Sequence, residues 1–293
     1  MNTYAATVRS RKQLSPHLVT ITLGLDAFPT TGIPDEYVRI LIPAAGEELV
    51  LPQIGDDYSW TYPEGTVEPA ARVYTISDHR MVEGRVEVDL DVALHDEGVG
   101  SDWARTCAAG QRVGIVEPHG LYKAAADVAW QLLVCDITGL PALARILRCL
   151  GPDQRADVVV VLTDAADQIA LPSLADVSVR WVVVDRVVDV SDALAAAVLE
   201  AELPAEGPRY VWLAGEARSS RTVRRHLRRT LGWPQSDFYT CGYWQVDAEK
   251  WLARYEEVAD EVIAEAAEVQ RSVGDDEGAY LDALDDIYER VGL

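Results

Sequence analysis

The chain has 293 residues, of which 49% are apolar, enough for two ordinary domains with buried cores. Its formal charge of −22 disfavours nucleic acid and anionic membranes as partners, because both require Lys and Arg side chains that neutralise phosphates. No stretch approaches the roughly 20 consecutive apolar residues of a membrane-spanning helix, and the first residues lack the apolar core of a signal peptide. We therefore expect a cytoplasmic protein without membrane insertion.

The cysteines give no sign of a metal centre. Cys107, Cys135, Cys149 and Cys241 are far apart in the sequence and include no Cys-x-x-Cys pair, so neither a zinc site nor an iron–sulfur cluster is predicted. We interpret them as small buried apolar residues in a reducing compartment.

Residues 3–122 have the pattern of an antiparallel β-barrel. Short runs rich in β-branched residues are separated by Gly, Pro and Asp, and several such strands at regular spacing favour a closed barrel. The expected strands are YAATVRS, HLVTITLGL, YVRILIP, ARVYTIS, RVEVDLDVAL and QRVGIV.

From residue 129 onward the pattern changes to that of a doubly wound parallel sheet. Apolar runs alternate with helical patterns, which is what a parallel sheet covered on both faces requires. The expected strands are WQLLVCDI, ADVVVVLTD, VRWVVVD and RYVWLAGEA, and the expected helices are LPALARILRCL, SDALAAAVLEA and SSRTVRRHLRRTLG.

The last part of the chain is an acidic helical extension. Residues 247–293 contain fifteen carboxylates and four basic residues, a net charge of −11. Apolar residues recur at helical spacing over 248–273, and a second short helix follows from residue 275. Trp251 and Tyr255 could pack on the preceding domain, close a cleft or mediate a dimer. The sequence leaves these alternatives open.

The first candidate for chemistry is the strand ARVYTIS, at residues 71–77. Side chains alternate along a strand, so Arg72 and Tyr74 share a face while Thr75 points the other way. An aromatic ring can stack on a flavin, a guanidinium can hold a diphosphate, and a Thr hydroxyl or amide can bond the flavin ring near its reactive nitrogen. The alternative is an ordinary Arg–Tyr pair at a sheet edge.

The second candidate is VDLDVALHDEGVGSDWA, in which a strand runs into a glycine-containing turn and then a helix. Gly98 and Gly100 let the backbone approach a ligand, and free amides at a helix N-terminus bind anions. His95 either bonds a cofactor or satisfies a buried carbonyl. The alternative for Ser101 is an ordinary helix N-cap.

The second domain lacks a G-x-G-x-x-G turn, but its first helix N-terminus, after CDITG, can still bind a phosphate, with Thr138 as its cap. Ligands of open α/β sheets lie beyond the carboxyl ends of the strands. We therefore expect Thr138, Asp164, Arg186 and Gly215 to gather at that edge.

The helix SSRTVRRHLRR carries the densest basic patch of the chain. It is either a site for a nucleotide phosphate or a face that pairs with the acidic extension. Arg218 and Arg221 lie nearest the preceding loop, so they are the candidates for phosphate binding. Paired carboxylates, a Ser–His–Asp order and metal-ligand spacing are not apparent, and hydride transfer through a flavin needs none of them.

In order and spacing, the runs RVYTIS, VDLDVALHDEGVGSDWA, EPHG, DITGLPALARIL, YVWLAGEA and GYW resemble the siderophore-interacting protein family over about residues 4–246. Members of this family are flavin reductases of the ferredoxin–NADP reductase-like superfamily. The resemblance implies an FAD-binding barrel at residues 1–126, an NAD(P)H-binding domain at 127–246 and the acidic extension at 247–293. It also implies that reduced flavin passes electrons from NADPH or NADH to a ferric siderophore and releases ferrous iron.

The resemblance assigns roles to particular residues. Tyr74 and Thr75 are the expected catalytic residues beside the flavin, and Asp136, Leu140 and Pro141 match the start of the NAD(P)H-binding domain. The expected cofactor-binding residues are Arg72, Tyr74, Thr75, Ile76, His95, Gly100, Ser101, Thr138, Gly215, Glu216, Arg218 and Arg221, and no metal site is expected.

The chain also departs from the family pattern. The flavin motif usually closes with Arg, where this sequence has Ser77, and Gln245 stands where Arg is common. Cys135 and Ile137 replace the usual Gly and Glu, and the whole chain has only three lysines. Two alternatives therefore stay open: a reductase of another small acceptor, and a non-catalytic siderophore- or flavin-binding protein. The expected assembly is a monomer or weak dimer.

Overall fold

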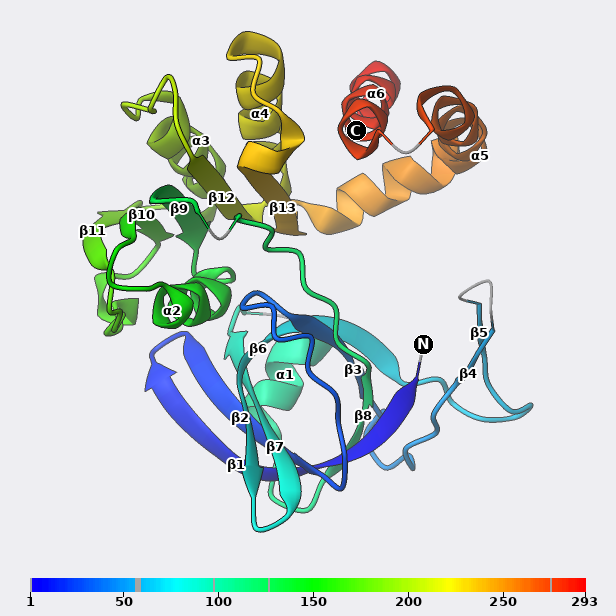
Figure 1. Ribbon diagram of the computed structural model, residues 1–293. Coiled ribbons are helices and arrows are strands. Elements are labelled where there is room, and N and C mark those ends of the chain that lie inside the picture. Colours follow the sequence, from blue (N-terminus) through cyan, green and yellow to red (C-terminus); the bar gives the residue numbers. More distant parts are fainter. Residues whose placement is uncertain (1, 56–58, 97, 126, 275) are drawn as a thin grey trace.

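The N-terminal part of the chain forms a closed β-barrel in the computed structural model, which describes residues 2–293 except 56–58, 97, 126 and 275 (Figure 1). The barrel strands run in the order β1-β2-β7-β6-β3-β8, and paired strands are antiparallel. The strands are β1 (Thr3–Ser15), β2 (Leu18–Leu25), β3 (Tyr37–Ile42), β6 (Ala70–Val82), β7 (Arg85–Ala93) and β8 (Arg112–Val116), with a separate hairpin of β4 (Gln53–Ile54) and β5 (Trp60–Thr61).

The alternation of apolar and polar residues explains why these segments close into a barrel. In β7, Val86, Val88, Leu90 and Val92 are buried, and the residues between them are partly exposed. A strand repeat of two sends every second side chain into the barrel core. The predicted barrel is confirmed.

The second domain is a parallel sheet in the order β11-β10-β9-β12-β13. Its central strands are buried on both faces; in β10 (Arg155–Leu162), the residues from Val158 to Leu162 are all buried. Such continuous runs are typical of a parallel sheet between two layers of helices. The other strands are β9 (Trp130–Asp136), β11 (Asp176–Val183), β12 (Arg209–Glu216) and β13 (Phe238–Trp244).

Helices cover both faces of this sheet, which confirms the predicted doubly wound domain. Helix α2 (Leu140–Cys149) packs on the face turned toward the barrel, while α3 (Val190–Leu199) and α4 (Ala217–Arg225) pack on the other (Figure 1). Among the helices that the structure describes, none is long and apolar enough to cross a bilayer. Short turns complete the domain: η1 (Ala165–Asp167), η2 (Val187–Asp189), η3 (His226–Thr230) and η4 (Gln235–Asp237).

A buried ion pair joins the two domains. Glu36, directly before β3, is 0% exposed and accepts a hydrogen bond from Arg145 Nη2 of α2 at 2.7 Å. Thr30 Oγ1, Thr31 N and Thr31 Oγ1 donate to the same carboxylate, each at 2.7 Å. Burial alone would raise the pKa of Glu36, but these hydrogen bonds together outweigh it and hold the pKa below its ordinary value.

A second set of hydrogen bonds joins the two domains away from the Glu36–Arg145 pair. Asp167 of η1 accepts hydrogen bonds at Oδ1 from Ser15 Oγ at 2.6 Å and from the His17 amide at 2.8 Å, both at the turn between β1 and β2. Asp35 accepts from the amide of Leu121, in the segment that links the domains, at 2.8 Å. The domains are therefore held by directional hydrogen bonds as well as by apolar contact.

The acidic extension forms a helical hairpin that docks on the second domain. Helix α5 (Ala248–Val273), whose predicted range is confirmed, leaves the end of β13, and α6 (Glu277–Val291) returns beside α4 (Figure 1). Trp251 and Tyr255 stack with ring centroids 5.3 Å apart. Trp251 also meets Tyr288 of α6, with centroids 6.0 Å apart, so both rings pack within the hairpin, and it is α6 that contacts the preceding domain.

Ion pairs hold α6 on the basic helix. Arg224 and Asp285 form a pair in which both side chains are only 8% exposed. Three further arginines of the predicted basic patch pair with carboxylates of the acidic extension. The other pairs are Arg228 with Asp282 at 2.8 Å, Arg229 with Asp286 at 2.8 Å and Arg225 with Glu289 at 3.0 Å.

We expect Asp285→Ala to release α6, because the buried Arg224 guanidinium loses its nearest carboxylate. Removing one partner of a buried pair costs about 3–5 kcal/mol, and Asp282 remains near Arg224, so a loss of about 2–3 kcal/mol is expected. Amide hydrogen exchange of α6 and denaturant unfolding measure it. Glu289→Ala is the control: its partner Arg225 is 41% exposed, so the cost should stay below about 1 kcal/mol. Equal effects of the two variants would contradict the prediction.

Glu36 should make the stability of the protein depend on acid pH. Its pKa is lowered in the folded state from 4.5, so its stabilisation is present above that pH and is lost as the pH falls through the lowered value. Glu36→Gln should therefore destabilise the protein most near neutral pH. The difference in unfolding free energy between the two proteins, measured in denaturant from about pH 7 to about pH 3, should narrow on acidification. A difference that stays constant with pH would show that the carboxylate charge contributes nothing to the free energy of unfolding.

Candidate functional site

The strand β6 and the helix α1 (Val99–Thr106) meet at Gly100. A Cβ atom added at Gly100 would lie 2.1 Å from Tyr74 Oη and 3.5 Å from Arg72 Cγ, so only glycine permits this approach. Arg72 and Tyr74 thus lie on one face of β6, against the first turn of α1, as predicted from the strand alternation. Tyr74 also stacks on Trp103 of α1, with centroids 6.3 Å apart.

The first turn of α1 presents backbone amides without a side-chain cap among the described residues. Gly98 is the N-cap residue and has φ 122°, which only glycine adopts readily. The alternative of Ser101 as the N-cap is wrong, because Ser101 lies inside the helix and its Oγ accepts from the His95 amide at 3.0 Å. That bond fixes the turn between β7 and α1.

These groups fit the diphosphate of FAD. The Arg72 side chain is exposed, and the hydrogen bond described for its guanidinium goes to the neighbouring Ala71 carbonyl at 2.8 Å. A guanidinium beside an uncapped helix N-terminus is a site for a phosphate anion. Burial raises the pKa of Tyr74 to about 12, with nearby Arg72 opposing the rise, so the phenol stays neutral.

Thr75 lies on the opposite face of β6, as predicted, and the structure turns that face toward the second domain. It is 5% exposed and pairs in register with Tyr37 of β3. Burial raises the pKa of Tyr243, at the end of β13, well above its ordinary value. A hydrogen bond between Tyr243 and the Thr75 side chain opposes this rise. Ile76 follows at 0% exposure with its side chain in the barrel core. Thr75 therefore stands where the two domains meet.

At the carboxyl end of the parallel sheet, Asp136 organises the loop before α2. Its Oδ1 accepts from the Thr138 amide at 2.9 Å and from Thr138 Oγ1 at 2.6 Å, and its Oδ2 accepts from Trp244 Nε1 at 2.7 Å. Burial raises the pKa of Asp136, and these donors oppose the rise. The prediction that Thr138 caps α2 is wrong: Gly139 is the N-cap residue, and Asp136 takes the Thr138 hydroxyl.

Gly215 reaches the same loop from β12. A Cβ there would lie 2.5 Å from Asp136 Oδ2, so glycine lets β12 approach the loop closely. Glu216 caps α4 by accepting from the amides of Arg218 at 2.7 Å and Ser219 at 3.3 Å. The Arg218 guanidinium donates to Asp192 at 2.7 Å.

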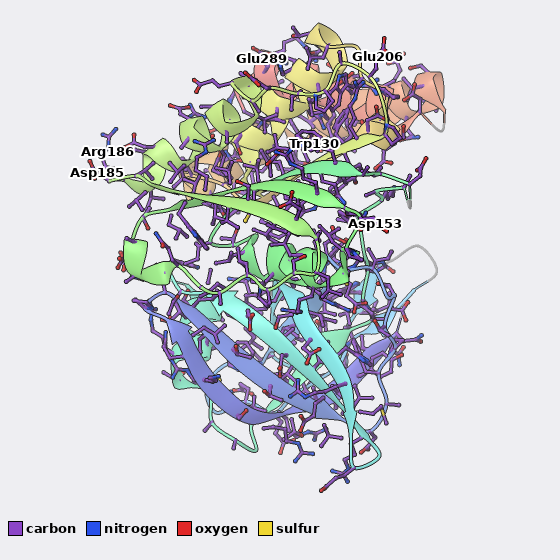
Figure 2. The ribbon with its side chains drawn as sticks, turned by 60° about the vertical axis from the view of Figure 1, so that its left-hand side comes forward. Trp130, Asp153, Asp185, Arg186, Glu206 and Glu289 are labelled. Carbon is purple, nitrogen blue, oxygen red and sulfur yellow. The ribbon has the colours of Figure 1, made fainter. Side chains whose placement is uncertain are left out.

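The predicted cluster at the carboxyl edge is only partly compact. Asp164 and Thr138 follow β10 and β9, and Gly215 lies in the neighbouring strand β12, but Arg186 follows the edge strand β11. Three strand spacings separate β11 from β12, about 14 Å. Arg186 lies at the periphery of the domain (Figure 2) and pairs with Asp189 at 2.6 Å. Arg221, one helical turn beyond Arg218, is half-buried on α4.

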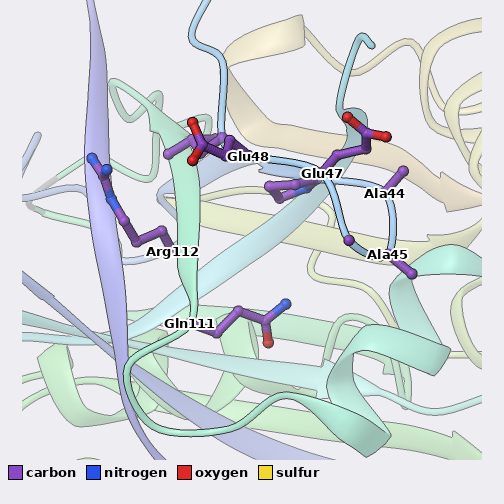
Figure 3. Close-up of a pocket in the computed structure, with 9 residues that line it drawn as sticks. Ala44, Ala45, Glu47, Glu48, Gln111 and Arg112 are labelled. Carbon is purple, nitrogen blue, oxygen red and sulfur yellow. The ribbon is translucent and has the colours of Figure 1, made fainter.

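A cavity of about 330 Å³ opens elsewhere on the barrel. The loop after β3 lines it with Glu47 and Glu48, opposite Gln111 and Arg112 at the start of β8 (Figure 3). None of the predicted site residues is among those that line it. This cavity therefore lies outside the candidate site.

Sequence reasoning missed the charged residues that bring the two halves of the site together. Glu36, Arg145 and Arg148 lie at the interface between β6 and α2. The signal was present in the helix LPALARILRC, where two arginines three residues apart interrupt an otherwise apolar segment.

A closed antiparallel barrel followed by a parallel sheet with helices on both faces is a fold that this chain shares with a ferredoxin reductase. The ferredoxin reductase of carbazole 1,9a-dioxygenase has this fold, with a TM-score of 0.58 at 16% identity over 83% of this chain and 70% of that one. Residues 7–122 match the family model "Siderophore-interacting FAD-binding domain", and residues 128–247 match "Siderophore-interacting protein". The chain belongs to the siderophore-interacting protein family.

The alignments with similar proteins extend over both domains of this chain. The NADPH-dependent ferric-chelate reductase of Escherichia coli is 29% identical over 81% of this chain and 91% of its own length. Ferric vibriobactin reductase ViuB of Vibrio cholerae is 26% identical over 80% and 86%. The siderophore utilization protein of T. fusca has a TM-score of 0.72 at 26% identity, over 83% of this chain and 93% of its own. The matched family model ends before α5.

We expect Gly100→Ala to weaken FAD binding about tenfold or more, a loss of about 1.4 kcal/mol. The new Cβ would lie 2.1 Å from Tyr74 Oη and would push the ring out of its place under α1. Titration of the apoprotein with FAD, followed by flavin fluorescence, measures the dissociation constant. Gly151→Ala is the control, since its nearest neighbour would be Gln154 Oε1 at 3.8 Å. Equal FAD affinities in the two variants would place the flavin away from α1.

Proposed function

We propose that this protein is an FAD-dependent oxidoreductase that reduces ferric siderophores with electrons from NADPH or NADH and releases ferrous iron. The observation that carries the proposal is the contact at Gly100, which brings the uncapped amides of α1 against Arg72 and Tyr74. A guanidinium, helix amides and an aromatic ring at one place match the diphosphate and ring system of a flavin dinucleotide. The names of the ferric-chelate and ferric vibriobactin reductases support the acceptor.

In this proposal, each residue of the flavin site has a distinct task. Arg72 and the first amides of α1 hold the diphosphate, while Tyr74 packs on the flavin ring. Thr75 orients the ring edge that faces the second domain, and the Ile76 backbone, whose amide and carbonyl bond Glu36 and Arg145, holds Thr75 in place. The bond between His95 and Ser101 fixes the phosphate turn. Bound FAD would supply the chemistry, accepting a hydride from the nicotinamide and passing single electrons to the iron.

The same proposal places the pyridine nucleotide at the carboxyl edge of the parallel sheet. Gly215 lets β12 pack closely on the loop that holds Thr138, and Glu216 fixes the start of α4. Arg218 and Arg221 are the nearest candidates for a nucleotide phosphate. We accordingly assign residues 1–126 to FAD, 127–246 to the pyridine nucleotide and 247–293 to a docked extension.

A different small acceptor is the second candidate, and the charge distribution favours it. The chain has three lysines; Lys123 pairs with Glu277 at 3.6 Å and Lys250 with Asp247 at 2.9 Å. With so few lysines, the chain attracts a strongly anionic ferric siderophore less than a neutral or weakly charged acceptor. We further propose a cytoplasmic location and a monomer or weak dimer.

The purified protein should show a flavin absorption spectrum that NADPH bleaches in the absence of oxygen. Adding a ferric chelate should then restore the spectrum and produce ferrous iron, captured by a colorimetric ferrous ligand. A panel of ferric chelates of differing charge identifies the acceptor. Bleaching without ferrous product would favour the second candidate, and a protein that takes up no FAD would sink the enzyme proposal.

Arg72→Gln should lower the affinity for FAD about 10- to 100-fold, because a charge-assisted hydrogen bond contributes about 1.5–3 kcal/mol. The matched control is Arg85→Gln, which changes an exposed arginine on another strand of the same barrel. Equilibrium titration with FAD compares the two variants. An unchanged dissociation constant in Arg72→Gln would remove Arg72 from the diphosphate site.

A further inference from the structure

Two arginines of α2 reach across the domain interface to the strand that carries the flavin motif. Arg145 Nη1 donates to the Ile76 carbonyl at 2.9 Å, and Arg148 Nη2 donates to the Ser77 carbonyl at 2.5 Å. These carbonyls belong to the two residues directly after Thr75. The nucleotide-binding domain therefore holds the flavin strand by its backbone.

The Ile76 carbonyl is available because β3 begins one residue too late to pair with it. Pairing between β3 and β6 starts at Tyr37 and Thr75, and the Ile76 amide still reaches the Glu36 carbonyl at 2.9 Å. The Glu36 amide, however, donates to the Ile33 carbonyl at 3.1 Å. Arg145 Nη1 supplies the hydrogen-bond donor that the Glu36 amide would have given if the ladder had continued.

The Ser77 carbonyl is available because β6 bulges at this residue. Ile76 pairs with Leu90 of β7, but the next pair is Asp78 with Asp89, so Ser77 is the extra residue of a β-bulge. A bulge interrupts the ladder and leaves its extra residue unpaired. Arg148 fills that gap from the other domain.

On the barrel side, Glu36 holds the Arg145 guanidinium in place. Its carboxylate is fully buried and takes Arg145 Nη2 at 2.7 Å, so the guanidinium has defined partners on both of its terminal nitrogens. Arg145 is itself only 14% exposed. A planar guanidinium with fixed partners holds a narrower range of geometries than an apolar contact.

The other end of α2 lies at the proposed nucleotide edge. The helix begins at Leu140, directly after the loop that Asp136 and Thr138 form, and spans its 10 residues in about 15 Å. A rigid helix thus runs from the nucleotide loop to the carbonyls next to Thr75. A displacement of α2 at the nucleotide loop therefore also moves the arginines that bond these carbonyls.

We infer that Arg145 and Arg148 are positioning residues, which set the flavin strand of β6 in register with the nucleotide-binding domain for hydride transfer. This inference rests on the proposed function. Neither arginine needs to touch the cofactor. Each acts through a main-chain carbonyl, and the distance between nicotinamide and flavin is the quantity that they control.

The test uses Arg148→Gln and Arg145→Lys in the full-length protein loaded with FAD. Arg148 is exposed, so Arg148→Gln removes its contact without leaving a buried charge unpaired, and Arg145→Lys keeps a cation beside Glu36. Arg155→Gln is the control, because that arginine pairs with Asp157 on β10, at a site outside the β6 contact. Amide hydrogen exchange of residues 70–82 and anaerobic stopped-flow reduction by NADPH are measured.

Both variants should speed exchange in β6 and slow the limiting rate of flavin reduction by roughly tenfold or more, since small misplacements of reacting atoms have effects of that size. The dissociation constants of FAD and NADPH should stay within about twofold, as should oxidation of the dithionite-reduced flavin by a small ferric chelate, because these steps need only one domain. Arg155→Gln should match the unaltered protein.

Unchanged exchange in β6, or an unchanged reduction rate in both variants, would overturn the inference. A parallel fall of FAD binding, melting temperature and both half-reactions would also overturn it, since that pattern marks a merely structural role. If the unaltered protein is not bleached by NADPH, the proposed function fails instead. The exchange measurement needs no turnover and still decides whether the arginines hold β6.

Discussion

The buried ion pair between Glu36 and Arg145 is the constraint on which the arrangement of the two domains depends. The barrel and the parallel sheet each have their own apolar core, and Leu18, with the partly buried Leu14 and Ala93, packs from the barrel onto the core beneath α2. Apolar contact of that extent tolerates sliding, whereas an ion pair with 0% exposure at Glu36 does not. The pair is tolerable in the interior because Thr30 and Thr31 complete the hydrogen bonds of the carboxylate.

Charge also shapes the far side of the molecule. The acidic extension covers the arginines at the C-terminal end of α4, while Arg218 and Arg221 precede that contact and lie toward the carboxyl edge of the sheet. The sequence offered two interpretations of the basic helix, and the structure bears out pairing with the acidic extension for four of its arginines. Phosphate binding by Arg218 and Arg221 stays a proposal, and the Arg218 guanidinium donates to Asp192 at 2.7 Å.

The parts of the fold that follow from local patterns could be predicted. Alternation at β7, the continuous apolar run of β10 and the helical spacing of 248–273 each depend on the segment's own burial, and each element is present where expected. The face shared by Arg72 and Tyr74 follows from the same strand alternation.

Two of the incorrect predictions concern caps; the others are the burial of all four cysteines, since Cys149 is exposed, and the place of Arg186, which follows the edge strand β11. Ser101 and Thr138 have the right side chains for capping, but in each case a group outside the helix takes the hydroxyl: the His95 amide donates to Ser101, and Asp136 accepts from Thr138. Cap chemistry depends on which partner the tertiary structure brings closer. The arginines of α2 left a signal in the sequence, but Glu36 as the partner of Arg145 could not be predicted, since 109 residues separate the two.

The departure of Ser77 from the family's flavin motif has a structural counterpart. The residue sits in a β-bulge at 7% exposure, and its Oγ donates to the Asp89 carbonyl at 3.3 Å. A small side chain suits that buried position, and a guanidinium from the other domain, that of Arg148, bonds the backbone there. A positive group thus stands at this point of the motif although the motif residue is neutral. Because it comes from α2, its place depends on the docking of the two domains.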